Sequence, residues 1–197
     1  MRVTAETKQA TRQEILTAAR RLFASQGYEA TTTRDISRTA GIAAGTLFNY
    51  FPTKEAIVGC LVAEALAKAD EEFWVATSIA TAPLEETLFA YAAIGLRKLR
   101  PLRKFLAPTL DCVFSPAASA GGSGFADDIR TRHLETVGRL LTRHGLVDGL
   151  SAHALQLYWT LYTGVIAFWT RDGSPKQEDT LALLDESIEM FVTWLMH

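Results

Sequence analysis

Residues 34–57 read RDISRTAGIAAGTLFNYFPTKEAI, and this stretch decides the fold of the first part of the chain. Its apolar residues are spaced to face inward from two short helices that meet at a tight turn: Ile36, Ala40, Ile42, Leu47 and Phe51. Ser37 is small where the two helices must approach each other, and Gly41 supplies the positive φ that the turn requires. The pattern therefore predicts a helix-turn-helix.

The residues around this stretch predict a three-helix head. An amphipathic helix precedes it and ends at Gly27, which favours a left-handed cap. The second helix follows the Thr-Thr-Thr run at 31–33, the third spans about 43–50, and Pro52 ends it. Thr53 is a suitable N-cap for a fourth helix that continues to about residue 75.

Helical periodicity continues to the C-terminus, with no sustained alternation typical of strands. A fifth helix begins after Pro83, and Pro101 separates it from a sixth at 102–114. Residues 115–124, SPAASAGGSG, predict a surface loop. Further helices are expected at 125–144, 151–171 and 177–196. The predicted fold is all-α, with about nine helices.

Charge divides the chain of 197 residues unevenly. Residues 1–54 hold eight Lys and Arg against four Asp and Glu, a net charge of +4, whereas residues 55–197 hold twelve against eighteen, a net charge of −6. A basic head on an acidic body indicates that only the head meets a polyanion. We therefore predict a DNA-binding domain at 1–54 and a helical ligand-binding and dimerisation domain at 55–197.

The compartment is predicted from what the sequence lacks. Two cysteines, Cys60 and Cys112, are too few for a disulfide scaffold, and the N-terminus has no apolar signal sequence. Residues 149–170 carry no Lys, Arg, Asp or Glu, and that length could span a bilayer. The polar residues in this segment and the absence of a flanking basic cluster favour a buried helix instead. We expect a cytoplasmic protein without a membrane partner.

The third helix presents an unusual outer face. With Leu47 and Phe51 inward, small residues lie beside an exposed Phe48 and Asn49, which suits a helix that enters a DNA major groove. Arg34 could reach a guanine edge, and threonine hydroxyls and Lys54 could contact phosphates. The alternative is that Phe48 and Tyr50 are core aromatics and Arg34 is merely solvated. The predicted DNA contacts are Thr32, Thr33, Arg34, Ala43, Ala44, Gly45, Thr46, Phe48, Asn49, Tyr50 and Lys54.

Three segments, LFASQGY, GYEATTTRDI and AGIAAGTLFNYFPTKEAI, together resemble the N-terminal region of the TetR family of transcriptional regulators, over about residues 9–60. The resemblance implies a homodimer that binds a palindromic double-stranded DNA operator, usually as a repressor, and releases it when a small molecule binds the larger domain. The chain departs from the family at two places. Ala43 and Ala44 stand where a basic or hydroxyl residue is frequent, and Phe48 stands where Tyr is common, so fewer phosphate contacts are expected from the third helix.

The last two helices each carry two apolar stripes, more than a helix on the surface of a monomer needs. The predicted dimer interface comprises Leu155, Trp159, Tyr162, Ile166, Trp169, Leu184, Ile188, Phe191 and Leu195. The second stripes comprise Leu157, Leu161, Gly164 and Phe168 on one helix and Leu183, Met190 and Trp194 on the other. The sequence does not decide which stripe faces a partner, and the alternative is that both helices are central in one large core.

Aromatic residues of the body could line an apolar effector pocket. The predicted lining is Phe73, Trp74, Phe89, Tyr91, Phe105, Phe114, Phe125 and Tyr162, with ordinary core packing as the alternative for each. The basic run from Arg97 to Lys104 suits a helix C-terminus, and an anion site at the pocket mouth is the other interpretation.

The sequence could also belong to an all-α enzyme or to a helical protein-interaction module. An enzyme is disfavoured, because no nucleophile motif or phosphate loop is present, and His133 and His144 lack a third metal ligand at a recognisable spacing. We therefore predict no catalytic residue, metal or cofactor. The other class is a helical protein-interaction module whose basic head does not bind DNA.

Overall fold

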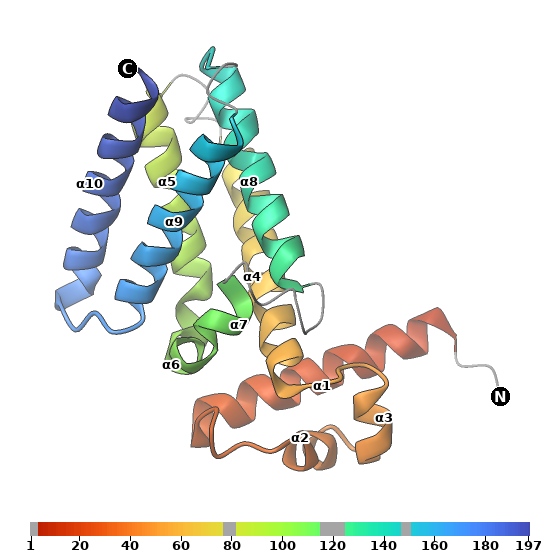
Figure 1. Ribbon diagram of the computed structural model, residues 1–197. Coiled ribbons are helices and arrows are strands. Elements are labelled where there is room, and N and C mark those ends of the chain that lie inside the picture. The colour runs from red at the N-terminus through yellow and green to blue at the C-terminus, as the bar shows by residue number, and fades with distance from the viewer. Residues whose placement is uncertain (1–3, 77–81, 115–124, 147–150) are drawn as a thin grey trace. The chain divides into compact units, whose positions relative to one another are not determined.

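The computed structural model describes residues 4–76, 82–114, 125–146 and 151–197, and every regular element in these ranges is helical (Figure 1). The all-α prediction is confirmed. The α-helices are α1 (Ala5–Gln26), α2 (Thr33–Thr39), α3 (Ala44–Phe48), α4 (Lys54–Val75), α5 (Leu84–Leu99), α6 (Arg103–Leu106), α7 (Leu110–Phe114), α8 (Phe125–Arg143), α9 (Ala152–Trp169) and α10 (Glu178–Leu195). Three short 3₁₀ turns occupy Arg100–Leu102, Ala107–Thr109 and Pro175–Gln177. The predicted loop at 115–124 lies outside the described residues.

The chain divides into two compact units, and each is described here by itself. The first comprises residues 1–63 with 102–126, and the second comprises 64–101 with 127–197. The division falls inside α4, between Ala63 and Glu64, so one continuous helix contributes residues to both units. The functional boundary between residues 54 and 55 stays a prediction, and the compact units do not follow it.

The helix-turn-helix of the first unit forms as its sequence predicts. Ile36, Leu47 and Phe51 are fully buried, and each such side chain contributes about 1.5–3 kcal/mol to folding. Gly41 has a φ of +69°, and the neighbouring Ile42 donates its N–H to the Ser37 carbonyl at 3.0 Å. The apolar spacing and the glycine turn thus bring α2 and α3 together.

The helix ends also follow from their sequence. The Ala56 N–H donates to the Thr53 hydroxyl at 3.1 Å, which confirms Thr53 as the cap of α4. Gly27 ends α1 with a φ of +86°. Its ψ of 163° places it outside the left-handed helical region, so only the positive φ of the predicted cap is confirmed.

The single helix predicted at 102–114 is wrong. This segment consists of α6, a 3₁₀ turn at Ala107–Thr109 and α7. Pro108 lies in its middle, where it cannot donate a backbone hydrogen bond and its ring clashes with the preceding turn of an α-helix. The chain therefore remains helical in outline but changes its hydrogen-bond pattern at the proline.

In the second unit, α10 packs against both α5 and α9, and the three helices lie side by side (Figure 1). The helix α9 buries its tyrosines and tryptophans, which explains its almost uncharged sequence without a membrane. None of the helices in the described ranges is long and apolar enough to cross a membrane.

Candidate nucleic-acid interface and effector region

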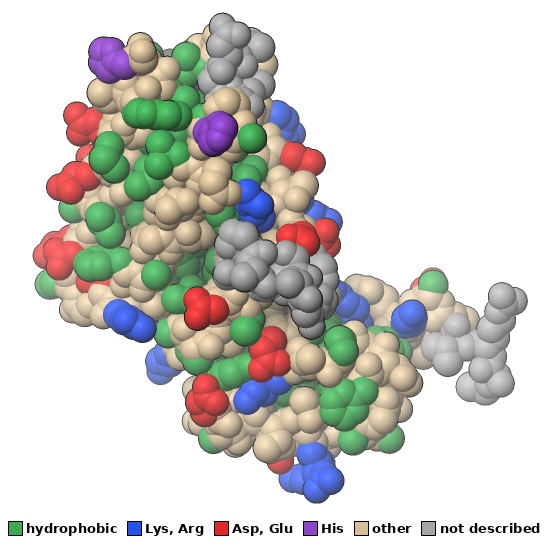
Figure 2. Space-filling view, in the orientation of Figure 1, with side chains coloured by type: hydrophobic (Ala, Val, Ile, Leu, Met, Phe, Trp, Pro, Cys, Tyr) green, Lys and Arg blue, Asp and Glu red, His purple; other side chains and the backbone are tan. Residues whose placement is uncertain are grey.

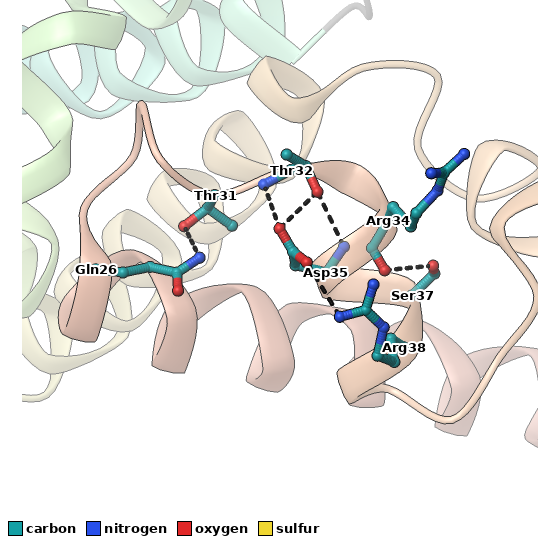
Figure 3. Close-up of polar contacts among 7 residues, drawn as sticks. All are labelled: Gln26, Thr31, Thr32, Arg34, Asp35, Ser37 and Arg38. Carbon is teal, nitrogen blue, oxygen red and sulfur yellow. Dashed lines mark hydrogen bonds and ion pairs between the residues drawn. The ribbon is translucent and has the colours of Figure 1, made fainter.

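The start of α2 is fixed by a reciprocal pair of hydrogen bonds between Thr32 and Asp35 (Figure 3). The Asp35 N–H donates to the Thr32 hydroxyl oxygen at 3.1 Å, while the Thr32 hydroxyl and N–H donate to the Asp35 carboxylate at 2.6 and 3.2 Å. These bonds from Thr32 lower the pKa of Asp35. The Thr32 hydroxyl proton is therefore committed to the helix cap, which corrects its predicted role as a donor to phosphate.

Arg34 is the second residue of the same helix, and its side chain is exposed to solvent. In Figure 3 it points away from the Thr32–Asp35 pair, and its carbonyl accepts a hydrogen bond from the Ser37 hydroxyl at 3.0 Å. The neighbouring Arg38 instead forms an ion pair with Asp35 at 3.5 Å. Arg34 thus has the exposure that contact with a base or a phosphate requires.

The outer face of α3 is small and apolar. Ala43, Ala44 and Gly45 are exposed, and Phe48 is 49% exposed, whereas the adjacent Leu47 is fully buried. Asn49 is exposed beside Phe48, and Thr33, Thr46 and Tyr50 are half-buried. The structure therefore places the predicted contacts from α3 together on an accessible surface.

Lys54 does not belong to this surface. Its Nζ donates to the carbonyls of Tyr28 and Thr31 at 2.8 and 3.1 Å, and it lies 4.0 Å from the centre of the Tyr28 ring. The prediction that Lys54 contacts phosphate is corrected, because its charge stabilises the connection between α1 and α2.

The same tyrosine links this connection to the start of α4. The Tyr28 hydroxyl donates to Glu55 at 2.5 Å, and burial together with this carboxylate raises the pKa of Tyr28. The sequence reasoning missed this cluster, because its members are separated by more than twenty residues. An aromatic residue after a capping glycine is the signal that could have suggested it.

The predicted effector residues separate into two groups. Phe105 and Phe114 belong to the first unit, where the Phe105 ring packs on Phe23 at 5.1 Å between ring centres. This places Phe105 in the core that joins α6 to α1. Phe125 begins α8, and its side chain lies outside the described residues.

The remaining members lie in the second unit, where they meet an unpredicted histidine. Phe73 contacts Tyr91 at 5.0 Å between ring centres, and Tyr91 in turn packs on His133 at 4.9 Å. Tyr162 stacks on His133 at 4.1 Å. Trp74 is 38% exposed and packs against the Arg139 guanidinium, and Phe89 is half-buried, so neither lies in the centre of this group.

His133 is the polar centre of this aromatic cluster, which we define as Phe73, Tyr91, His133, Tyr158, Trp159 and Tyr162. Its Nε2 lies 3.2 Å from the Tyr158 hydroxyl, and its side chain is 5% exposed. Burial lowers the pKa of His133 to about 3, so the ring is neutral at physiological pH. The Tyr162 hydroxyl is buried and has no hydrogen-bond partner among the residues that the structure describes.

The predicted dimer-interface residues lie mostly in the core of one protomer. Leu155 and Leu195 are half-buried, and the other seven are at most 4% exposed: Trp159, Tyr162, Ile166, Trp169, Leu184, Ile188 and Phe191. This corrects the predicted interface, because side chains packed inside one chain cannot be the main contacts with another. The exposed large apolar residues of α9 and α10 are Phe168, Leu181, Met190 and Trp194.

A groove of about 530 Å³ also opens on the second unit. Its apolar lining comes from α5, α9 and α10, and Arg97, Arg100 and Lys176 lie at its edge. Within the basic run, Arg97 and Lys98 form ion pairs with Glu72, and Arg97 and Arg100 line this groove. Both interpretations of the run stay predictions.

The first part of the chain is similar in sequence to known bacterial transcriptional regulators. Residues 15–59 match the model of bacterial regulatory proteins of the tetR family. The HTH-type transcriptional repressor KstR2 of Mycolicibacterium smegmatis is 37% identical over 75 residues, which cover 38% of this chain and 37% of that protein. The repressor AcnR of Corynebacterium diphtheriae is 43% identical over 60 residues, or 30% of this chain and 32% of that protein. The matches thus span about a third of the length of these relatives.

The similarity of fold extends over most of the chain. The crystal structure of Thermus thermophilus FadR, a TetR-family transcriptional repressor in complex with lauroyl-CoA, aligns with a TM-score of 0.72. The alignment covers 92% of this chain and 93% of that one at 19% sequence identity. At 19% sequence identity this similarity shows a shared fold only. The aligned residues include helices of both compact units.

Proposed function

We propose that this protein, whose residues 15–59 match the model of bacterial regulatory proteins of the tetR family, is a transcriptional regulator that binds a palindromic DNA operator as a homodimer. In this proposal it acts in the cytoplasm as a repressor, and a small, largely apolar molecule releases it from DNA. The observation that carries the proposal is the exposed face of α3, together with the exposed Arg34 of α2, in a head that matches the family model over residues 15–59.

The proposed DNA contacts come from the exposed and half-buried residues of α2 and α3. Arg34 and Asn49 supply donors for base edges or phosphates, and Thr33 and Thr46 supply hydroxyls. Thr32 and Lys54 act indirectly, because they hold α2 and the connection before it in place. The net charge of +4 on residues 1–54 favours approach to DNA, and the acidic body keeps this attraction local.

The proposed dimer forms through the exposed apolar residues of α9 and α10. Phe168 and Trp194 are 43% and 50% exposed, and hydrophobic side chains spread over this part of the second unit in Figure 2. Exposed apolar patches of this kind mark interaction sites. Pairing α9 and α10 with their copies forms a four-helix interface, and two recognition helices related by symmetry match a palindromic operator.

The proposed effector region is the aromatic cluster around His133. The cluster is aromatic, His133 is neutral, and the Tyr162 hydroxyl has no hydrogen-bond partner among the described residues. These features suit an uncharged, largely apolar group with one hydrogen-bonding atom. The complex of Thermus thermophilus FadR with lauroyl-CoA supports an apolar effector in this fold, although the sequences are only 19% identical.

Release from DNA requires the effector to bind one conformation of the protein more tightly than the other. A shift from mostly bound to mostly free needs about 5.5 kcal/mol of differential binding. The helix α4 is the proposed link, since it runs without interruption from Lys54 to Val75 and carries Phe73 of the aromatic cluster. A change in α4 would alter the spacing of the two recognition helices, and a palindrome with fixed spacing would no longer engage both.

Selection of genomic DNA fragments by the purified protein tests this proposal. We expect retained fragments to share a palindromic sequence, and footprinting to show protection of both halves. Arg34→Ala should weaken binding by about 1–3 kcal/mol if Arg34 contacts a base. Arg143→Ala removes an exposed arginine from the body and serves as the matched control, with little expected change. Failure to retain any fragment would favour a protein-interaction module instead.

A further inference from the structure

We propose that Phe48 recognises the C5-methyl group of a thymine, so that each operator half-site carries a thymine facing α3. The inference rests on the proposed DNA-binding function and specifies what the surface of α3 reads. Two independent features of the head support it: the exposure of one aromatic ring, and a glycine that the folded head does not require.

Among the described residues of the first unit, Phe48 is the one large apolar residue that is exposed, and 49% of its surface is accessible. The phenylalanines Phe23, Phe51, Phe105 and Phe114 of that unit are at most 5% exposed. Hydrophobic side chains are visible over α3 in Figure 2. A phenyl ring has no hydrogen-bonding group, so it cannot bind a phosphate in the way that a tyrosine hydroxyl does. An apolar group is the partner that would cover this ring favourably.

Gly45 lies three residues before Phe48, and such residues are neighbours on a helix surface. A Cβ atom at Gly45 would meet nothing within 4 Å, and its φ is not in the positive region that favours glycine. Glycine lowers helix stability relative to alanine, so the head gains nothing from Gly45 by itself. The missing side chain instead leaves bare backbone that a partner can approach closely.

The size and chemistry of this surface favour a base edge over a protein. A single ring beside Ala44 and Gly45 is far smaller than a stable protein interface. Asn49, which follows Phe48, and Arg34 of α2 are exposed polar residues of the same head, and their side chains match adenine and guanine edges. In a major groove lined with hydrogen-bonding groups, the thymine methyl is the apolar group that a phenyl ring can cover.

Replacement of thymine by deoxyuridine tests the inference, because it removes the methyl group and keeps every hydrogen-bonding atom of the base. The probe is the duplex that the wild-type protein selects from a randomised pool, with each thymine replaced in turn. At the thymine that faces Phe48 we expect affinity to fall about fourfold for one half-site and about 15-fold for both, which corresponds to one methyl group withdrawn from apolar contact in each half.

Three variants connect this effect to the structure. Phe48→Ala should abolish the difference between thymine and deoxyuridine, and Phe48→Tyr, which keeps the ring, should retain it. Asn49→Ala alters the exposed neighbour and should lower affinity for both duplexes while keeping their ratio. Circular dichroism verifies that each variant is folded, as expected for substitutions at exposed positions.

The possible failures are distinguishable. If the wild-type protein selects a duplex but no deoxyuridine substitution weakens binding, thymine recognition is overturned and DNA binding stands. A thymine preference that persists in Phe48→Ala would assign the methyl contact to another residue and also overturn the inference. If no duplex is selected, the proposed function itself fails.

Discussion

Replacing the buried histidine of the aromatic cluster should change how stability depends on pH. His133 is 5% exposed, lies between the rings of Tyr91 and Tyr162, and has its Nε2 3.2 Å from the Tyr158 hydroxyl. Burial alone lowers its pKa from 6.5 to about 3. The unfolded chain therefore binds a proton below about pH 6.5, whereas the folded chain stays neutral until about pH 3.

The sign and size of the effect follow from this difference. Because the unfolded state binds more protons between pH 6.5 and pH 3, the free energy of unfolding falls as the pH decreases through that window. At pH 5 the contribution of His133 to the loss is about 2 kcal/mol relative to pH 8. His133→Gln cannot take up the proton, so its stability should fall by about 2 kcal/mol less than that of the wild type over the same interval.

Urea unfolding at pH 8 and pH 5, at one fixed protomer concentration, measures this difference. The substitution itself costs packing energy, but that cost is present at both pH values and cancels. His153→Gln removes an exposed histidine from α9 and serves as the control, with a pH dependence close to that of the wild type. Equal losses in wild type and His133→Gln would refute the reasoning, because the ring would then titrate alike in folded and unfolded chains.

Four further substitutions test other parts of the structure. Tyr162→Phe removes a buried hydroxyl without a hydrogen-bond partner, so urea unfolding should show no loss and a gain of up to about 1 kcal/mol; a loss above about 1 kcal/mol would show that the hydroxyl is bonded. Trp194→Glu should give folded monomers by light scattering and circular dichroism, whereas Trp169→Glu should unfold the chain, because only Trp194 is exposed. Asp172 accepts hydrogen bonds from the Thr180 N–H and hydroxyl at 3.1 and 2.5 Å, which lower its pKa. Asp172→Asn should therefore lower the free energy of unfolding measured in urea at pH 7, and this loss should shrink as acid protonates the wild-type carboxylate.

Local patterns in the sequence were sufficient to predict the head. Gly41 supplies the positive φ of the turn between α2 and α3, and Thr53 caps α4. The spacing of Ile36, Leu47 and Phe51 brings α2 and α3 together. Each of these depends on residues a few positions apart, and the structure confirms them. The exposure of the α3 face follows from the same spacing, because burying Leu47 turns Phe48 outward.

Interactions between distant segments explain what the sequence did not reveal. Lys54 is charged and follows a proline turn, yet it binds carbonyls of residues 28 and 31, which no local pattern indicates. The two stripes of α9 are similarly apolar, so only packing against α10 and against His133 of α8 decides which one is buried. The spacing of His133 from His144 suggested a possible metal ligand. Its actual environment, a neutral ring stacked on Tyr162, depends on tertiary contacts that the spacing does not reveal.

The affinity of the wild-type protein for its selected palindrome, compared with a scrambled duplex of the same composition at about 150 mM salt, tests the central proposal most directly. We predict binding of two protomers with a preference of at least about 10³-fold for the palindrome, and a decrease in affinity as salt increases. Equal affinity for the two duplexes, or no measurable binding of either, would contradict the proposal that the head of this protein recognises an operator.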